Sequence, residues 1–419
     1  GVAVLYVPNL EKALDTIVPF FYDYPARAMR VVGITGTNGK TTTSYLVRAI
    51  LRHAGRRVGL IGTIQAMIED EVLPTSNTTP DIIVLQQMLA EMRTRGMDTV
   101  VMEVSSHALA LGRVAGIEFD TAVFTNLTQD HLDFHKTMEN YARAKAHLFE
   151  LVSAPGAKEG KTAVLNADDA ASETMRAYTR CPIITYGVDH PADLTAQDVQ
   201  LACDGMELTL MHGGKRLFHL HTGVTGLFNV HNVLAAVGAS LAEHVAATDI
   251  AAALTAFTGV PGRFELVREG QDFAVIVDYA HTPDGMENVL RTARAVTKGR
   301  VIAVFGCGGD RDRTKRPIMG RIGAEMADIA ILTSDNPRTE DPAAIVDEVE
   351  RGVLPVIGDK PYEKIVDRRT AIFHAIGRAQ AGDTVVILGK GHETYQILKD
   401  GTIHFDDREQ AREAIRSRA

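Results

Sequence analysis

Short apolar runs rich in β-branched residues alternate with amphipathic helical patterns along most of this chain, and this alternation limits the folds open to it. In the first half, the strand patterns occupy residues 30–35, 58–61, 99–103, 121–124 and 162–165. In the second half, they occupy residues 273–277, 300–305, 329–332 and 384–388. Such alternation is typical of α/β folds, in which helices connect parallel strands. We therefore predict a mostly parallel, doubly wound sheet in the first half and a Rossmann-like sheet in the second.

The boundary between these two parts is predicted at residues 259–262, Gly-Val-Pro-Gly, because glycine and proline interrupt helices and strands. The 419 residues suffice for two or three domains. We expect a central domain at 25–261 and a C-terminal domain at 262–419. Residues 1–24, with an extended run at 2–7 and a helical pattern at 10–21, are too few to bury a core, and we expect them to be the end of an N-terminal domain.

One segment of the first half departs from the α/β pattern. Between about residues 201 and 221, the periodicity falls to two residues around Gly213-Gly214. A period of two with a glycine pair at its centre is typical of a β-hairpin. We expect an antiparallel hairpin attached to the main sheet, followed by a helix at 230–244.

A glycine-rich loop follows the strand pattern at 30–35 and precedes a helical pattern. Backbone N–H groups of such a loop bind a polyphosphate, a lysine reaches the terminal phosphates, and a threonine hydroxyl reaches Mg²⁺. Ile34 stands where the full Walker spacing has a glycine, so the match is to a shorter loop. A purely structural glycine turn is the alternative, but Gly-Lys-Thr-Thr at this junction favours nucleotide binding. The loop residues are Gly36, Thr37, Asn38, Gly39, Lys40, Thr41 and Thr42.

Polar side chains follow two further strand patterns. Glu103 ends the strand at 99–103, and Asp130-His131 follow the strand at 121–124. Because ligands bind at the carboxyl ends of parallel strands, we expect Glu103 to ligate a metal and His131 to offer a neutral imidazole there. A helix cap at Asp130 beside a surface histidine is the structural alternative. For Lys145, on a helix predicted from about 138 to 150, the pattern alone predicts a solvated side chain.

The composition excludes several classes of protein. The net charge of −9 argues against a general nucleic-acid binder. No run approaches the roughly 18 apolar residues that a membrane helix needs, and no secretion signal opens the sequence. The three cysteines lie far apart, without the spacing of a disulfide framework or a zinc site. We expect a cytoplasmic protein with neither membrane nor nucleic acid as a partner.

Several motifs, in order along nearly the whole chain, resemble those of the Mur ligases, ATP-dependent amide-forming enzymes of peptidoglycan synthesis. In the first half these are residues 36–42, Asn-Thr-Thr-Pro at 77–80, Glu-Val-Ser-Ser-His at 103–107 and the Asp130-His131 segment. In the second half, the motifs resemble the MurE type, which adds meso-diaminopimelate. They are Asp-Tyr-Ala-His-Thr-Pro-Asp at 278–284, Gly-Cys-Gly-Gly-Asp-Arg-Asp at 306–312, Asp-Asn-Pro-Arg at 335–338 and Gly-Lys-Gly-His-Glu at 389–393.

The resemblance implies an architecture and a role for each matching residue. It implies a central P-loop domain, a Rossmann-like amino-acid-binding domain, and only the tail, 1–24, of the family's UDP-binding domain. Lys40 and Thr41 would serve the ATP phosphates and Mg²⁺, and Glu103, His131 and a carbamylated Lys145 would hold a magnesium pair. The other residues implied for ATP are Asn229, Asn232, Arg263 and Asp278. Those implied for the muramoyl peptide are Asn77, Thr78, Thr79, Ser105 and Arg113, and those for the amino acid are Arg311, Asp335, Asn336, Arg338, Gly389 and Glu393.

The implied reaction transfers the ATP γ-phosphate to the D-glutamate γ-carboxylate of UDP-MurNAc-L-Ala-D-Glu, and the diaminopimelate amine then displaces phosphate. Glu393 or His281 could orient the amine, and the sequence leaves both open. We expect a monomer whose partners are its small-molecule substrates. The alternatives are a motor or signalling NTPase, a binding protein without catalysis, a lysine-adding ligase and a folylpolyglutamate synthase. The Asp-Asn-Pro-Arg segment separates the last two from the diaminopimelate-adding type.

Overall fold

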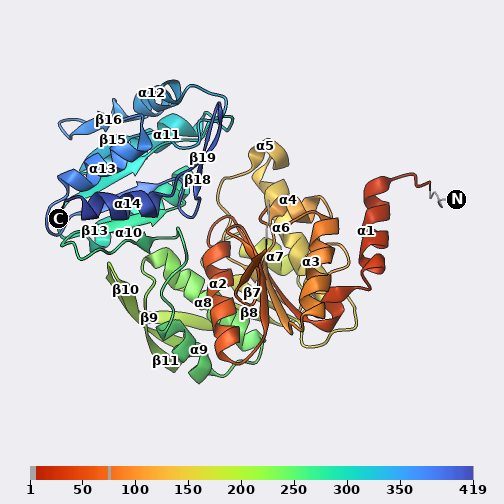
Figure 1. The fold of residues 1–419 in the computed structure, drawn as a ribbon. Helices are drawn as coiled ribbons and strands as arrows, with labels where there is room; N and C mark the ends of the chain where they lie inside the picture. Colours follow the sequence, from red (N-terminus) through yellow and green to blue (C-terminus); the bar gives the residue numbers. More distant parts are fainter. Residues whose placement is uncertain (1–5, 74–76, 419) are drawn as a thin grey trace. The chain divides into compact units, whose positions relative to one another are not determined.

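An 11-stranded sheet organises the first half of the chain in the computed structural model, which describes residues 6–73 and 77–418 (Figure 1). In spatial order the strands run β11-β10-β9-β8-β7-β6-β1-β5-β2-β3-β4. Their bounds in chain order are β1 (Arg30–Thr35), β2 (Val58–Ile61), β3 (Ala66–Ile68), β4 (Glu71–Leu73), β5 (Thr99–Glu103), β6 (Thr121–Phe124), β7 (Thr162–Asn166), β8 (Ile183–Gly187), β9 (Leu194–Ala202), β10 (Gly205–His212) and β11 (Lys215–Thr222).

The central strands of this sheet are parallel, and β1 lies between β5 and β6. From β1 the chain passes through α2 (Lys40–His53) toward β2, whereas from β6 it passes through α6 (Met138–Ser153) to β7 on the other side. Right-handed crossovers in opposite directions place these two helices on opposite faces of the sheet. The carboxyl ends of β1, β5 and β6 therefore meet at a topological switch point, where α/β folds bind ligands.

The remaining helices of this part surround the sheet. Leu85, Leu89 and Met92 of α3 share a buried core with Leu148 and Phe149 of α6. The bounds are α1 (Leu10–Phe21), the 3₁₀ helix η1 (Pro25–Ala28), α3 (Ile82–Thr94), α4 (Ser106–Ala110), α5 (Leu132–His135), α7 (Ser172–Tyr178), α8 (Leu227–Ala242) and α9 (Ala247–Thr255).

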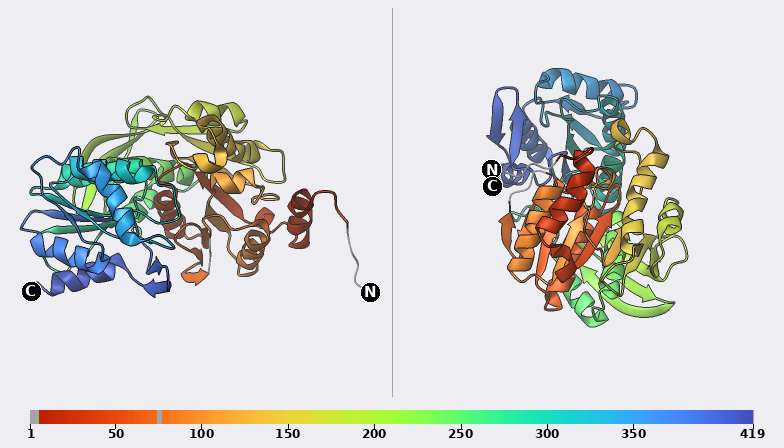
Figure 2. Two further views of the ribbon diagram at one scale, coloured as in Figure 1. Left: turned by 90° about the horizontal axis from the view of Figure 1, so that it is seen from above. Right: turned by 90° about the vertical axis from the view of Figure 1, so that its right-hand side faces the viewer.

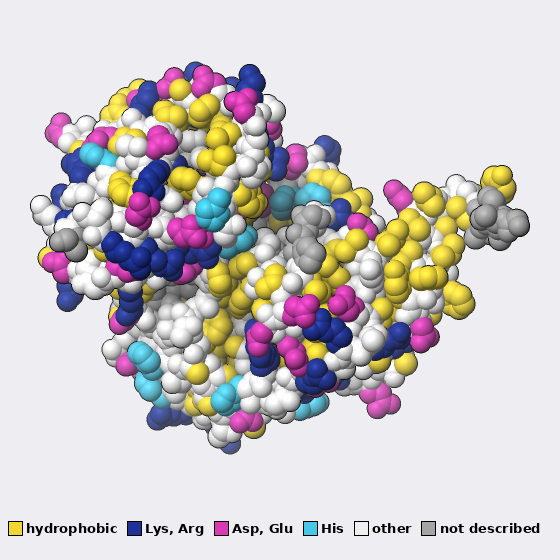
Figure 3. Space-filling view, in the orientation of Figure 1, with side chains coloured by type: hydrophobic (Ala, Val, Ile, Leu, Met, Phe, Trp, Pro, Cys, Tyr) yellow, Lys and Arg dark blue, Asp and Glu magenta, His cyan; other side chains and the backbone are white. Residues whose placement is uncertain are grey.

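Helix α1 lies at the edge of this core. Its Val18 and Pro19 are buried, but much of its apolar surface is exposed, and Figure 3 shows hydrophobic side chains along it. The exposed large side chains are Leu10, Ile17, Phe20 and Phe21. No described helix has the length and hydropathy that crossing a bilayer requires.

A six-stranded sheet, ordered β12-β13-β17-β14-β15-β16, organises the second half (Figures 1 and 2). Neighbouring strands are parallel except at the β12/β13 edge. The strands are β12 (Glu265–Leu266), β13 (Ala274–Asp278), β14 (Val301–Phe305), β15 (Ile329–Leu332), β16 (Tyr362–Lys364) and β17 (Thr384–Leu388), and a separate antiparallel hairpin comprises β18 (Tyr395–Leu398) and β19 (Gly401–His404). The helices are α10 (Pro283–Val296), α11 (Lys315–Met326), α12 (Pro342–Val353), α13 (Arg368–Arg378) and α14 (Asp407–Arg416).

The chain divides into two units, one of residues up to 199 with 207–222 and 228–257, the other of residues 200–206, 223–227 and 258–419. The predicted α/β class is confirmed, with two mostly parallel sheets and a Rossmann-like second one. The hairpin predicted around Gly213-Gly214 is present as β10 and β11. Its strands are antiparallel, because a two-residue connection permits no other pairing.

The predicted elements agree with the structure to within a few residues. The helix at 10–21 and six of the nine strand patterns have the predicted bounds. The strand at 162–165 extends to Asn166, those at 273 and 300 each begin one residue later, and the helix expected at 230–244 spans Leu227–Ala242. The extended run expected at 2–7 falls mostly outside the described residues. Eight strands were not predicted, because they are short or partly exposed and lack a continuous apolar run. They are β3, β4, β8, β9, β12, β16, β18 and β19.

Candidate active site

The glycine-rich loop lies at the carboxyl end of β1 and leads directly into α2, which begins at Lys40. Gly39 caps the helix with φ +84°, in the left-handed region that favours glycine. A Cβ on Gly36 would lie 1.8 Å from the Thr125 hydroxyl oxygen, and one on Gly39 would lie 2.3 Å from Asn232 Oδ1. The two glycines are therefore required by close packing of the loop against its neighbours.

The segment after β6 holds this loop in shape. The Thr37 N–H donates to the Asn126 carbonyl (2.8 Å), and the Asn38 N–H donates to Asn126 Oδ1 (2.9 Å). The Thr125 hydroxyl donates to the Asn38 carbonyl (2.6 Å). Thr125 and Asn126 thus support the loop, a role that their sequence pattern did not reveal.

Lys145 is buried beside the loop, with 1% of its surface exposed. Its Nζ donates to the Gly36 carbonyl at 2.8 Å and lies 4.5 Å from the centre of the Tyr141 ring. Burial, and then the nearby Lys40, hold the pKa of Lys145 well below its ordinary value. The solvated lysine that the helical pattern alone predicted is therefore wrong, because this side of α6 packs against the sheet.

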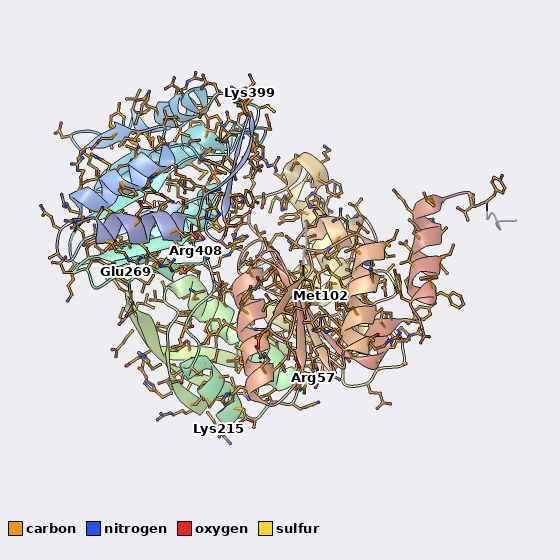
Figure 4. All side chains as sticks on the ribbon, in the orientation of Figure 1. Arg57, Met102, Lys215, Glu269, Lys399 and Arg408 are labelled. Atoms are coloured by element: carbon orange, nitrogen blue, oxygen red, sulfur yellow. The ribbon has the colours of Figure 1, made fainter. Side chains whose placement is uncertain are left out.

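Glu103 ends β5 and is fully buried. Its carboxylate accepts hydrogen bonds from the Thr41 hydroxyl (3.1 Å) and from the Thr63 hydroxyl and N–H (both 2.9 Å). Figure 4 labels the preceding residue, Met102, which is buried within the sheet. Glu103 therefore lies next to the first turn of α2, as the strand order predicts.

The residues present fit a magnesium ion bound mainly through a nucleotide. Across residues 6–73 and 77–418, no three His, Cys, Asp or Glu side chains come together as a metal site. Mg²⁺ commonly takes one or two protein ligands and completes its octahedron with phosphates and water. The Thr41 hydroxyl and the Glu103 carboxylate, 3.1 Å apart beside the phosphate loop, suit that arrangement.

His131 lies in a cluster of aromatic rings over this edge of the sheet. Its ring centre lies 4.7 Å from that of His107 and 6.0 Å from that of Tyr141, which in turn contacts Lys145. Burial lowers the pKa of His131 and of His107, and burial with these two neighbours lowers the pKa of His135 to about 4. The lowered pKa favours the neutral form of the His131 imidazole. Of its neighbours, His107 belongs to the motif at 103–107 but was given no role, and His135 was not indicated by the sequence.

The turn at 77–80 lies against the end of β5. The Thr79 hydroxyl donates to the Glu103 carbonyl (2.9 Å) and accepts from the Ser105 N–H (3.0 Å). Arg113 donates to the Thr79 carbonyl (3.1 Å), and the hydroxyls of Thr78 and Thr63 lie 3.0 Å apart. The structure therefore brings Thr78, Thr79, Ser105 and Arg113 together, and Asn77 begins the same turn.

The first turns of α8 lie against the phosphate loop. Asn232 Nδ2 donates to Asn229 Oδ1 at 2.9 Å, and Asn232 Oδ1 lies close to Gly39. His231, between the two asparagines, hydrogen-bonds to Asp168 through Nε2 at 2.9 Å. Asp168 also accepts from the backbone N–H groups of residues 188–190, so it links α8 to the loop after β8.

In the second unit, Arg263 and Asp278 lie at one end of β13. The Asp278 carboxylate accepts from the N–H groups of Phe264 (2.6 Å) and Ala280 (2.7 Å), and burial raises its pKa despite the nearby Arg263. The Arg263 guanidinium lies 4.6 Å from the centre of the Tyr279 ring. His281 is exposed, and its Nδ1 lies 3.0 Å from the Tyr279 carbonyl.

A second cluster of predicted residues forms where β15 and β17 end. Asn336 Nδ2 donates to Glu393 Oε2 (2.8 Å), and the Asn336 amide oxygen accepts from the Ile397 N–H (2.9 Å). A Cβ on Gly389 would lie 2.4 Å from Asp335 Oδ2. Lys390 is buried among these residues. It belongs to the Gly-Lys-Gly-His-Glu motif, but the sequence pattern indicated no role for it.

Arg338 reaches the loop that follows β14. Its Nη1 donates to the Gly309 carbonyl at 2.8 Å, and its N–H donates to the Ile397 carbonyl at 3.0 Å. A Cβ on Gly308 would lie 2.9 Å from this guanidinium and 3.9 Å from Arg311 Cγ. The two arginines predicted for the amino-acid pocket thus border the same glycine.

A fully buried ion pair ties the two strand ends together. Arg368 donates to both oxygens of Asp407 (2.8 and 2.6 Å), to the Ser334 carbonyl (3.1 Å) and to the Leu388 carbonyl (2.9 Å). Ser334 and Leu388 directly precede the loops that carry Asn336 and Glu393. Arg368 and Asp407 were missed because they are far apart in sequence and belong to no recognised motif.

Comparison with protein families gives two matches that together cover most of the chain. The Mur ligase middle domain matches residues 34–240, and the Mur ligase, glutamate ligase domain matches residues 262–391. A relative in Bacillus cereus is 50% identical over 418 residues, spanning 100% of this chain and 84% of its own length. One in Listeria monocytogenes is 47% identical, spanning 99% and 84%. Both are named UDP-N-acetylmuramoyl-L-alanyl-D-glutamate--2,6-diaminopimelate ligase.

Solved structures give a consistent result. A structure of a protein with this same name has a TM-score of 0.71 and 35% identity, covering 100% of this chain and 85% of the other. A folylpolyglutamate synthase from Mycobacterium tuberculosis, complexed with ADP, has a TM-score of 0.74 at 20% identity, covering 92% and 93%. The second likeness concerns the fold alone.

Proposed function

Because this chain belongs to the Mur ligase family, we propose that it joins meso-diaminopimelate to UDP-MurNAc-L-Ala-D-Glu at the expense of ATP. It is an ATP-dependent acid–amino-acid ligase that forms an amide at the D-glutamate γ-carboxylate. The observation that carries this function is identity of 47–50% to ligases of this name over almost the whole chain. The residues of both clusters described above have the chemistry that this reaction needs.

The first step activates a carboxylate that does not react with amines at neutral pH. The phosphate loop and Lys40 bind the ATP phosphates, and Thr41 and Glu103 would hold Mg²⁺, which neutralises charge on the phosphates during transfer. Thr78, Thr79, Ser105 and Arg113, with Asn77, hold the muramoyl peptide. The γ-phosphoryl group moves to the D-glutamate carboxylate, so phosphate becomes the leaving group of the second step.

Further residues complete the ATP site in this proposal. Asn229 and Asn232 contact the adenine end, Asp278 contacts the ribose, and Arg263 serves the phosphates. The support for the asparagines is that Asn232 lies against Gly39, beside the phosphate loop, and is hydrogen-bonded to Asn229. His131, whose ring centre lies 6.0 Å from that of Tyr141 and whose lowered pKa favours the neutral form, would be a ligand for a second Mg²⁺.

We further propose that Lys145 is carbamylated. Its lowered pKa favours the neutral amine, whose lone pair attacks CO₂ while one C=O bond opens and an N–H proton passes to water. The product is an anionic carbamate that can ligate Mg²⁺. The support is a fully enclosed amine that contacts a carbonyl and an aromatic ring and lies beside the phosphate loop.

The second unit binds the incoming amino acid in this proposal. Arg338 and Arg311 suit the distal carboxylate of diaminopimelate, which lysine lacks, because a guanidinium can give a carboxylate two parallel hydrogen bonds. Asp335, Asn336, Gly389 and Glu393 surround the rest of the molecule. Glu393 or His281 orients the attacking amine, and Glu393 lies within the amino-acid cluster whereas His281 contacts Tyr279.

Beyond the reaction itself, we propose a place for the protein in the cell. It acts as a monomer in the cytoplasm, in the synthesis of peptidoglycan precursors, and so serves cell-wall formation, cell shape and division. Its partners are the three small-molecule substrates rather than nucleic acid or membrane. In domain terms, residues 25–261 form the central domain that carries the phosphate loop. Residues 262–419 form the Rossmann-like domain that binds the amino acid and also carries Arg263 and Asp278.

An ATP-consumption assay with a panel of acceptors tests this function. Phosphate release should require Mg²⁺, UDP-MurNAc-L-Ala-D-Glu and meso-diaminopimelate together, and lysine should replace diaminopimelate poorly. Equal use of lysine would favour a lysine-adding ligase, and use of a folate with glutamate would favour a folylpolyglutamate synthase. Undiminished ATP hydrolysis without the muramoyl peptide would favour an NTPase.

A further inference from the structure

Lys390 lies at the centre of the amino-acid cluster, immediately after Gly389 at the end of β17, and its side chain is fully buried. Its Nζ donates to Glu393 Oε2 (2.9 Å) and to Asn336 Oδ1 (3.2 Å). Burying an ammonium is costly unless partners compensate, and here both polar partners are residues of the proposed acceptor pocket. Lys390 is therefore held in place by hydrogen bonds to two residues of that pocket.

The hydrogen bonds at Glu393 are distributed unequally between its two oxygens. Lys390 Nζ and Asn336 Nδ2 both donate to Oε2, at 2.9 and 2.8 Å. Within the described chain, Oε1 accepts no hydrogen bond. Two donors on one oxygen set the rotation of the carboxylate and leave the other oxygen for a donor that the protein does not supply.

Lys390 also fixes the orientation of the Asn336 amide. Asn336 Oδ1 accepts from Lys390 Nζ and from the Ile397 N–H, so the amide oxygen must point toward these two donors. Nδ2 is then directed toward Glu393. Loss of Lys390 would thus remove one hydrogen-bond donor from Glu393. It would also weaken the constraint that directs the second donor, Asn336 Nδ2, toward Glu393.

We propose that Lys390 is a positioning residue that holds Glu393 with Oε1 presented to an amino group of the incoming amino acid. This inference rests on the proposed function, because it takes Glu393 as part of the acceptor pocket. The ligand group at Oε1 is an ammonium or amine, whose N–H donates to the carboxylate. Lys390 itself does not touch the amino acid and acts through Glu393.

The test begins with Lys390→Met, which keeps the length of the side chain and removes its charge and hydrogen bonds. The KM for diaminopimelate should rise about 10- to 100-fold, the range for loss of one hydrogen bond to a charged group, while the KM for ATP stays within about twofold. Lys390→Arg, which keeps the positive charge and the hydrogen-bond donors, should restore part of the loss. Lys360→Met is the matched control, since Lys360 Nζ caps carbonyls at the end of α11 in the same unit and should leave both KM values unchanged.

A double-mutant cycle separates positioning from simple structural support. In a Glu393→Gln background, Lys390→Met should raise the diaminopimelate KM by less than about threefold, because the Glu393 carboxylate through which Lys390 acts is already replaced. Equal effects in both backgrounds, or an unchanged KM in Lys390→Met, would overturn the proposal. If Lys390→Met does not fold, as judged by thermal unfolding, Lys390→Gln takes its place in the same cycle with the same criteria.

Activity of the unmodified protein tests the proposed function, separately from the role of Lys390. If it joins no amino acid to the muramoyl peptide, the proposed function fails before any variant is compared. If it joins an amino acid other than diaminopimelate, the same cycle is run with that acceptor, and the role of Lys390 stands or falls on that result.

Discussion

Lys40 and Lys145 donate hydrogen bonds to the same oxygen, the carbonyl of Gly36, each at 2.8 Å. Two ammonium groups so close repel each other, and Lys40 is one cause of the lowered pKa of Lys145. Conversion of Lys145 to a carbamate would replace this repulsion with attraction and would add an anionic ligand beside the phosphate loop. The pair thus connects the geometry of the loop with the proposed chemistry of Lys145.

Lys145→Ala should therefore be inactive and should regain activity when short carboxylates such as acetate or formate are added. The added anion would occupy the space of the carbamate and supply its oxygen ligands. Arg143→Ala, on the exposed side of the same helix, should retain full activity and serves as the control. Full activity of Lys145→Ala without any additive would contradict the carbamate.

Lys40→Ala should abolish ATP consumption, because no other side chain of the loop supplies a cation to the terminal phosphates. Phosphate release measured with all substrates present checks this. Lys136→Ala, whose lysine lies on the exposed turn after α5, should behave like the unmodified protein. Chelation of Mg²⁺ with EDTA should stop the unmodified protein equally, and residual turnover in EDTA would show that the metal is dispensable.

Arg338→Ala should depress the use of diaminopimelate and leave ATP binding nearly unchanged. Removing one partner of a buried charge pair costs about 2–5 kcal/mol, so kcat/KM for diaminopimelate should fall roughly thirty-fold to several thousand-fold. Steady-state kinetics with each substrate varied in turn measures this. Arg313→Ala removes an exposed arginine from the same loop region and provides the control. An unchanged preference for diaminopimelate over lysine in Arg338→Ala would refute the assignment.

Asp168→Asn should destabilise the protein at neutral pH but not in strong acid. Burial alone would raise the pKa of Asp168, but hydrogen bonds from the Val188 and Asp189 N–H groups and from His231 and His190 lower it to about 2. A carboxyl whose pKa falls on folding stabilises the folded state above its unfolded pKa of 3.8, and this contribution disappears as the pH falls toward 2.

The free energy of unfolding of Asp168→Asn should accordingly be lower than that of the unmodified protein by roughly 1–3 kcal/mol at pH 7. The difference should shrink between about pH 4 and pH 2, as measured by urea denaturation at several pH values. Asp189→Asn, at an exposed position nearby, should show no such pH-dependent difference. A constant difference from pH 7 to pH 3 would show that ionisation of Asp168 contributes nothing.

The local features of this protein were predictable from the sequence. The loop at 36–42 could be identified because its glycines and its lysine are contiguous, and the strands around it are continuous apolar runs. Glu103 and His131 could be placed at one edge of the sheet because Glu103 ends a strand pattern and His131 lies in the segment that follows another. Order along the chain was enough, since parallel strands bring their carboxyl ends to the same side.

Other features depended on contacts between distant segments and could be found only in the folded chain. The helical pattern alone predicted a solvated side chain for Lys145. Its burial results from the packing of α6 on the sheet beside Gly36. Likewise, the Arg368–Asp407 pair joins the first residues of α13 and α14. The hydrogen bond of Lys390 to Asn336 joins the loops after β17 and β15, which come together only in the folded sheet. The sequence by itself determined which local conformations and chemical groups are present, because these depend on neighbours in the chain. Only the tertiary structure decided which charges are buried together, because burial and pairing depend on segments that the sequence separates.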